Sequence, residues 1–150
     1  MSDASPRPQL GSNFRVEIDA GNGHVLEIGC CEVLFPSFRV PADAWQAADT
    51  ARDPGPLTLR RASGGGTELY DWWDQARRGR APKRRTLHVT LLADDRASVV
   101  LRWRFLEVRP VALGYSPLRS MESALVIESI ELAFESIEME AGARPMRARP

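Results

Sequence analysis

Alternation of apolar and polar residues is the feature that most constrains this chain. Two stretches place apolar residues at every second position: Phe14, Val16 and Ile18 in one, and Val99, Leu101, Trp103 and Phe105 in the other. In a β-strand this period puts all the apolar side chains on one face. The sequence therefore predicts a mainly β protein whose strands each bury one face.

Further strands are expected between turn-forming residues. With the two above, the predicted strands cover residues 14–19, 24–29, 32–40, 57–62, 85–92 and 97–108. The turns at 20–23 and 93–96 are rich in Gly, Asn and Asp, which favour hairpin connections. Pro36 interrupts the third strand, which should bulge there or lie where no ladder hydrogen bond is needed. Residues 41–56 are expected to form a loop.

One segment has the period of a helix instead. Its apolar residues fall at i, i+3, i+4 and i+7 and are expected to face the core: Leu69, Trp72, Trp73 and Ala76. Thr67 is a candidate N-cap and Gly79 a candidate C′ residue. The sequence predicts a single helix packed against the sheet.

Residues 124–139 fit both periods. Helical spacing selects Ile127, Ile130, Phe134 and Ile137, whereas strand spacing selects Val126, Ile130, Leu132 and Phe134. The β-branched residues favour a strand, while the Glu content and Ala133 favour a helix. Periodicity leaves both assignments open.

The length of 150 residues predicts one domain, here residues 13–140. Residues 1–12 and 141–150 are rich in Pro, Arg and small residues and are expected to be flexible arms. The chain has neither the apolar core of a signal peptide nor a stretch of about 20 apolar residues. We therefore expect synthesis in the cytoplasm and no insertion into a membrane.

Charge and residue types argue against most chemical functions. Lys plus Arg equals Asp plus Glu at 20 each, so no overall positive field attracts nucleic acid. His24 and His88 lack a second ligand at metal-binding spacing, and Cys30 and Cys31 are adjacent. No nucleophile, base and oxyanion donors can be combined. We expect no catalytic residue, no cofactor and no metal.

One cluster of positive charge remains to be explained. Six basic residues lie within nine positions: Arg77, Arg78, Arg80, Lys83, Arg84 and Arg85. With tryptophans as stacking faces, such a cluster can bind nucleic acid. The helical period points Trp72 and Trp73 toward the core, however, and the Glu-rich final segment can neutralise the cluster. A subunit contact or a solvated turn is favoured.

Five motifs in order resemble the tail tube protein family of contractile-tailed phages and phage-derived contractile injection systems. They cover roughly residues 13–138 and consist of Asn13–Ile18, Leu57–Arg61, Glu68–Trp73, Arg102–Phe105 with Arg109–Val111, and Ile127–Ala133. The resemblance implies a β-sandwich or partly closed β-barrel flanked by one helix. It also implies a long strand over the final segment and a structural, non-enzymatic role.

The resemblance further implies partners. By this resemblance the chain is expected to form homo-oligomeric, hexameric rings, which stack around a payload conduit beside paralogous tube subunits, sheath and baseplate proteins. In this chain the loop at 41–56 is shorter than in the family. We therefore predict a specialised ring near the baseplate or tube end of a phage tail or injection particle. Trp45, Arg52 and the basic cluster are the candidate interface residues.

Two other functions are weighed against this one. A small-ligand-binding β-barrel would use Trp103 and Phe105 to line a pocket. A small nucleic-acid-binding β-domain would use Arg84 and Arg85 of the basic cluster, with salt-sensitive binding.

Overall fold

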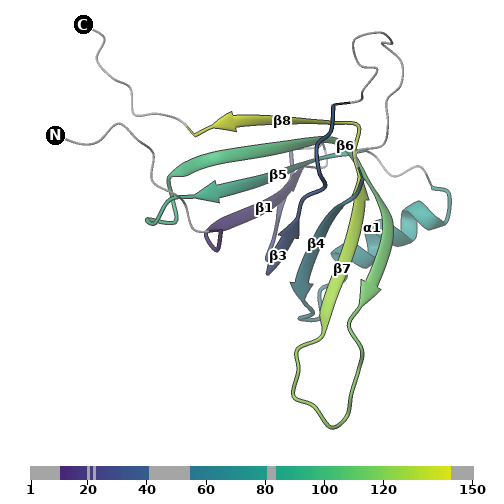
Figure 1. Cartoon of the computed structure of the whole chain (residues 1–150). Coiled ribbons are helices and arrows are strands. Elements are labelled where there is room, and N and C mark those ends of the chain that lie inside the picture. Colours follow the sequence, from purple (N-terminus) through teal and green to yellow (C-terminus); the bar gives the residue numbers. More distant parts are fainter. Residues whose placement is uncertain (1–10, 20, 22, 41–54, 81–83, 143–150) are drawn as a thin grey trace, which may run out of the picture.

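Strand β6 (Val99–Tyr115) is the longest element, and the others are arranged around it (Figure 1). The computed structural model describes residues 11–19, 21, 23–40, 55–80 and 84–142. Most of the two predicted arms lies outside these ranges, so the arms stay a prediction. The other elements are β1 (Phe14–Asp19), β2 (Val25–Ile28), β3 (Glu32–Leu34), β4 (Leu57–Ala62), α1 (Glu68–Arg77), β5 (Arg85–Leu92), β7 (Ile127–Ala133) and β8 (Ser136–Ala141).

All strand pairs are antiparallel, in the order β2-β1-β5-β6-β7-β4-β3, and β8 also pairs with β6. The first half of β6 pairs with β5 and β8, and its second half pairs with β7. We call the strands from β2 to the first half of β6, together with β8, sheet A. Sheet B is the second half of β6 with β7, β4 and β3. The predicted mainly β fold with one helix is confirmed, and the sheet is bent and not closed into a barrel.

The sheet bends where β6 passes from sheet A to sheet B, as Figure 1 shows. Glu107 has a φ of 58°, in the left-handed region that non-glycine residues seldom adopt. Leu87 pairs with Phe105 but Arg85 pairs with Val108, so β6 has one residue more than β5 here. An extra residue of this kind is a β-bulge, which bends the strand. We call this bend, at residues 106–109 and 134–135, the corner.

The final segment forms two strands in one line, β7 and β8. Arg109 pairs with Ala133 and Leu106 with Ser136, so the pairing with β6 keeps one register across the corner. The amide of Glu135 donates to the Leu106 carbonyl oxygen at 3.0 Å. The strand assignment is thus confirmed, but the expectation of a single long strand is wrong. The segment breaks at 134–135 because its partner β6 bends there.

Two other strands differ in length from their predictions. The third strand, predicted over 32–40, is only Glu32–Leu34, because Pro36 has no N–H for a ladder. The sixth strand, predicted over 97–108, continues to Tyr115 through Pro110. A register shift between Pro110 and Ala112 in the pairing with β7 accommodates this proline.

A single apolar core joins both sheets and the helix. Its buried members come from β1, β2, β4, β5, β6, β7, α1 and the corner: Val16, Ile18, Ile28, Leu57, Leu59, Leu69, Trp72, Leu87, Val89, Phe105, Val108, Ile130, Leu132 and Phe134. Phe105 and Phe134 meet edge to face at the corner, with ring centroids 4.9 Å apart. The bend thus allows the inner faces of the two sheets to share one core.

Helix α1 covers part of this core. Leu69 and Trp72 are each 1% exposed, whereas Trp73 and Ala76 are half-buried. Thr67 is the N-cap residue, but its hydroxyl donates to the Asp71 carboxylate and not to the backbone. After the helix Gly79 has a φ of 68°, the left-handed conformation of a C′ glycine.

Truncation of Trp72 is expected to destabilise the protein. Trp72→Ala removes a buried indole and should lower the free energy of unfolding by about 3–5 kcal/mol, measured by chemical denaturation. Trp72→Phe should cost much less, because the indole N–H is buried without a hydrogen-bond partner. Tyr70→Ala, at a 39% exposed position of the same helix, is the control. Equal stability of Trp72→Ala and Tyr70→Ala would contradict the packing of α1.

A buried ion pair connects β4, β7 and α1. Nε of Arg61 donates to Oε1 of Glu128 at 2.7 Å, and the two side chains are 12% and 3% exposed. Arg61 also pairs with Glu68 at the start of α1 (3.1 Å), and the Tyr115 hydroxyl donates to Glu128 (2.7 Å). The Glu128 contact raises the pKa of Tyr115 to about 12, so this phenol stays protonated. These bonds satisfy the carboxylate, which burial would otherwise penalise.

Removal of one partner of this pair should be costly. Glu128→Ala leaves the buried Arg61 guanidinium unpaired, and we expect a loss of about 3–5 kcal/mol in the free energy of unfolding. The matched control is Glu32→Ala, which removes the ion pair to the neighbouring Arg60, where both side chains are over 40% exposed. That change should cost about 1 kcal/mol or less. If Glu128→Ala and Glu32→Ala lowered the free energy of unfolding by similar amounts, the buried Arg61–Glu128 pair would be no more important for stability than the exposed Arg60–Glu32 pair, and the prediction would be wrong.

Candidate assembly surfaces

The predicted interface residues are only partly within the described chain. Trp45, Arg52 and Lys83 lie outside the described residues, so their roles stay predictions. The described members of the basic cluster lie at the end of α1, in the connection to β5 and at the start of β5: Arg77, Arg78, Arg80, Arg84 and Arg85.

Most of these arginines already have partners. Arg77 and Arg78 both pair with Asp74, at 2.6 and 3.0 Å. Arg84 pairs with Glu107 and Glu135, and so ties together the two chain segments of the corner. Within the described ranges, Arg80 and Arg85 of the cluster have no carboxylate partner. Of the final segment, only Glu135 pairs with the cluster, at Arg84, whereas Arg77 and Arg78 pair with Asp74 of α1. These pairs weaken the case for a nucleic-acid site.

Arg85 has a different environment. Its guanidinium lies over the Trp72 ring, 4.7 Å from the centroid, and its burial lowers the pKa of the side chain from its usual value. This cation–π contact fixes the end of the connection between α1 and β5 on the core. Arg85 is therefore a packing residue. Its side chain is half-buried, whereas that of Arg80 is exposed to solvent.

The outer face of sheet A carries two polar rows, in which cross-strand pairing aligns side chains from edge to edge. One row is Glu27, Glu17, His88, Arg104 and Glu138, and the other is Arg15, Thr90, Arg102 and Glu140. The opposite face of these strands holds core residues such as Val16, Val89 and Phe105. Sheet A therefore has one apolar and one charged side.

Both signs of charge are present in the polar rows, in close contact. Nε of Arg104 donates to Oε1 of Glu138 at 2.9 Å, and Nε of Arg15 lies 3.3 Å from Oε1 of Glu17. Burial and the neighbouring Arg102 lower the pKa of His88, so its imidazole is neutral at pH 7. Adjacent opposite charges largely cancel at a distance, so this face holds neither a polyanion nor a polycation strongly.

Sequence analysis missed these rows as a surface. The signal was available, because Arg102 and Arg104 alternate with Trp103 and Phe105. Glu138 and Glu140 could not be assigned to the same sheet face as Arg102 and Arg104, because residues 124–139 fit both the helical and the strand period. The basic cluster is the more evident charge pattern in the sequence, since its residues are close together along the chain.

Trp103 and Phe105, considered as the lining of a ligand pocket, are used for packing. The ring of Phe35 lies 4.9 Å from that of Trp103 and 6.1 Å from that of Phe105, centroid to centroid. Phe105 is fully buried. Phe35 thus packs against both rings.

Four strand edges are unpaired among the described residues. The strands β2 and β8 end sheet A, and β3 and the second half of β6 end sheet B. Such edges expose backbone N–H and C=O groups that can pair with another chain. Val25 and Leu26 of β2 are 55% and 41% exposed, and Met139 of β8 is 62% exposed. The edges of sheet A are thus apolar as well as unpaired.

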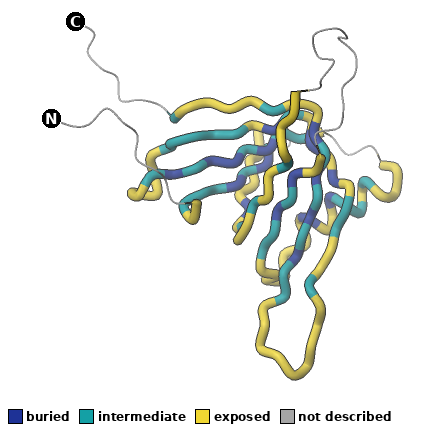
Figure 2. Tube along the Cα trace, in the orientation of Figure 1, coloured by how far each residue is buried: buried dark blue, intermediate teal, exposed yellow. Residues whose placement is uncertain are grey.

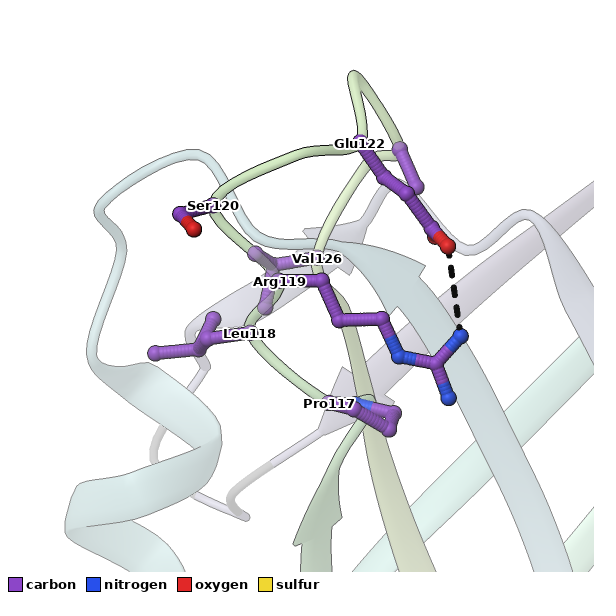
Figure 3. A pocket seen from close by; sticks show the side chains of 7 residues that line it. Pro117, Leu118, Arg119, Ser120, Glu122 and Val126 are labelled. Carbon is purple, nitrogen blue, oxygen red and sulfur yellow. Dashed lines mark hydrogen bonds and ion pairs between the residues drawn. The ribbon is translucent and has the colours of Figure 1, made fainter.

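The connection between β6 and β7 is a long loop, residues 116–126, which we call the β6–β7 loop. Ser116 and Ile127 close its base with two hydrogen bonds, of 2.9 and 2.8 Å. Arg119 and Glu122 pair across its turn at 3.4 Å, beside a shallow pocket lined by Pro117, Leu118, Ser120 and Val126 among others (Figure 3). Figure 2 shows that the loop extends beyond the sheet and is exposed.

The described residues give no sign of metal or membrane chemistry. They contain no group of three His, Cys, Asp or Glu side chains that could hold a metal ion. In the same ranges, no helix has the length and apolar character needed to span a membrane.

Burial raises the pKa of Cys30 to about 12, so this thiol is protonated and unreactive.

Solved structures similar to this chain come from contractile injection systems. A chain in the baseplate of the anti-feeding prophage (AFP) is 17% identical with a TM-score of 0.73, covering 91% of this chain and 98% of that one. A chain of the sheath/tube terminator of the PVC extracellular contractile injection system is 17% identical with a TM-score of 0.72, covering 92% of this chain and 100% of that one. A chain of the PVC sheath–tube complex is 17% identical with a TM-score of 0.69, covering 89% of this chain and 92% of that one. At these identities the likeness establishes the fold.

The family assignment comes from the sequence. A comparison with curated protein sequences finds no significant match. The family model described as T4-like virus tail tube protein gp19 matches residues 12–138, which include every strand except the end of β8. This match agrees with the order of motifs and with the bent, mainly β fold, and the chain belongs to the tail tube protein family.

Proposed function

We propose that this chain is a structural subunit, not an enzyme, of the inner tube of a phage tail or contractile injection system. Its copies join into rings, hexameric as the family resemblance implies, which stack around a payload conduit inside a sheath and above a baseplate. The observation that carries the proposal is the tail tube family match over residues 12–138. The similar structures are of a baseplate, a sheath–tube complex and a sheath/tube terminator, which supports a place in such a particle.

The edges of sheet A support assembly into rings. A cyclic ring needs two different surfaces, one on each side of every copy, that fit one another. Sheet A ends in β2 on one side and β8 on the other, and both edges are unpaired in the described chain. Pairing β2 of one copy with β8 of the next would satisfy their backbone groups and cover Val25, Leu26 and Met139.

The polar rows support the role of a conduit wall. If the strands of sheet A join around a ring, one sheet face lines the channel, and the apolar face is already used by the core. The polar rows would then line the channel with paired charges of both signs. A wall that binds neither sign of charge strongly allows a payload to move along it.

A charge at the β2 edge should prevent ring assembly and leave the fold intact. Val25→Lys places an ammonium beside Asp19, its cross-strand neighbour, on an exposed edge. Edge lysines oppose pairing between sheets, so we expect monomers in sedimentation velocity and no rings in negative-stain micrographs. The melting temperature should be unchanged.

Asp94→Lys, at the exposed turn between β5 and β6, is the control and should assemble like the native chain. Rings of Val25→Lys equal to native rings would contradict edge pairing through β2. A native chain that stays monomeric at high concentration beside its sheath and baseplate partners would contradict the proposed function.

We further propose a specialised ring, near the baseplate or the tube end. The support is the short 41–56 loop together with the similarity to chains from a baseplate and a terminator. Quantitative mass spectrometry of purified particles should find about one or two rings' worth of this chain beside a commoner paralogue. If this chain were the most abundant tube component, it would instead be the ordinary tube subunit.

A further inference from the structure

The second half of β6 has a partner strand on one side only. On that side it pairs with β7, and Ser116, the residue after β6, donates its N–H to the Ile127 carbonyl oxygen at 2.9 Å. The backbone groups of successive residues in a strand point to alternate sides, so those of Leu113 and Tyr115 point away from β7. Within the described ranges no other strand pairs with them. We call this side of residues 109–115 the β6 edge.

Helix α1 lies beside the β6 edge and extends past it. The helix packs mainly on β6, and Figure 1 shows it behind this strand and reaching to the right of it. Leu69 and Trp72 face the core, but Tyr70 is 39% exposed and Trp73 is half-buried. The Tyr70 ring lies 6.0 Å from that of Trp73, centroid to centroid, and near the Tyr115 phenol. The helix thus offers aromatic side chains just beyond the last strand of sheet B.

The two faces of the sheet differ at the β6 edge. Leu113 and Tyr115 lie on the core face, toward α1, where Leu113 packs on the core and the Tyr115 hydroxyl bonds to Glu128. Arg109 and Gly114 lie on the opposite face and are exposed. A strand added here therefore needs apolar side chains on its core face and polar side chains on the other.

One end of the β6 edge carries a positive charge. Arg109, at the corner, is exposed, and no carboxylate in the described part of the chain forms an ion pair with it. Side chains directly opposite one another on neighbouring strands have Cβ atoms about 5 Å apart, so a carboxylate on an added strand can reach Arg109. Such a pair would also fix the register, because a slip of one residue turns every side chain to the other face.

The described chain has no spare strand to fill this edge. In the proposed ring β2 and β8 pair with each other, and β3 has only three residues. The occupant is therefore sought in a different protein, and this step rests on the proposed function.

We propose that the β6 edge binds an extended segment of a different protein as an added strand of sheet B. The segment alternates aliphatic with polar residues and places a carboxylate opposite Arg109. Hydrogen bonds to the backbone of Leu113 and Tyr115 supply affinity, and contacts with Tyr70 and Trp73 select the aliphatic side chains.

A synthetic strand tests the site on the native chain. The probe is the fluorescein-labelled peptide Glu-Val-Thr-Val-Thr-Val-Thr, which has the proposed alternation and one side-chain carboxylate. Fluorescence anisotropy should show binding with a Kd below about 1 mM. The same peptide with methyl groups on its central amide nitrogens is the control and should not bind, because it cannot pair as a strand. No binding of the unmethylated peptide at about 1 mM, or equal binding of both peptides, would overturn the proposal.

Hydrogen exchange locates the bound peptide. The amides of Leu113 and Tyr115 should exchange at least about tenfold more slowly in the presence of the peptide, because they gain hydrogen-bond acceptors. The amide of Gly114, which points toward β7, should change little. Slower exchange in β2, β3 or β8, without slower exchange of Leu113 and Tyr115, would overturn the assignment of the site.

Substitutions separate the aromatic and the charged parts of the site. Tyr70→Ala should weaken peptide binding about tenfold at an unchanged melting temperature, since this side chain is partly exposed. Arg109→Gln should weaken binding about threefold at low salt, and should not affect a peptide with Gln in place of Glu. Val25→Lys, at the β2 edge, is the control and should bind like the native chain. Native affinity in both Tyr70→Ala and Arg109→Gln would overturn the proposal.

The native chain alone distinguishes a different protein from a second copy. Where this chain forms rings without other proteins, Leu113 and Tyr115 should exchange as fast as in the monomer. Slower exchange there would show that a second copy fills the β6 edge, and would overturn the choice of a different protein. If rings do not form but the peptide binds, the proposed function fails and the edge site stands. If rings form but the peptide does not bind, the edge site fails and the proposed function stands.

Discussion

The bend in β6 is the feature on which the rest of the structure depends. A flat eight-stranded sheet would expose one whole apolar face, and helix α1 is too short to cover it. At Glu107 the bulge turns the second half of β6 away from the first, and the inner faces of sheets A and B then enclose one core. The rings of Phe105 and Phe134 fill the corner, and Arg84 ties Glu107 to Glu135 on its outside.

Local patterns were enough to predict most of the elements. Strands β1, β4 and β5 have the predicted bounds, because alternation ends at turn-forming residues on both sides. The helix also lies where its period placed it, with Leu69 and Trp72 on its buried side. Each of these elements is determined by neighbouring residues, so a single sequence contains the information.

The corner could not be predicted in this way. Nothing around Glu107 differs from an ordinary strand, since its left-handed φ results from packing between residues far apart in the chain. The break in the final segment has the same origin, because Phe134 leaves the ladder to pack on Phe105 at the corner. The third strand ends for a local reason, since Pro36 follows it. The surfaces depend on the same long-range pairing. The polar row through Arg104 exists only because β5, β6 and β8 are in register.

The equal numbers of acidic and basic residues in the chain are explained in part by ion pairs between strands. Arg61 with Glu128, Arg84 with Glu135 and Arg104 with Glu138 pair residues that are distant in sequence. Ion pairs within one copy thus hold eight of the fourteen described arginines, and the net charge of the chain at pH 7 is zero. Copies of such a chain approach one another without long-range repulsion, whereas a strongly charged subunit would have to overcome that repulsion at every contact. The proposed assembly would then depend on short-range complementarity, for which the unpaired strand edges and the exposed apolar side chains are the candidates.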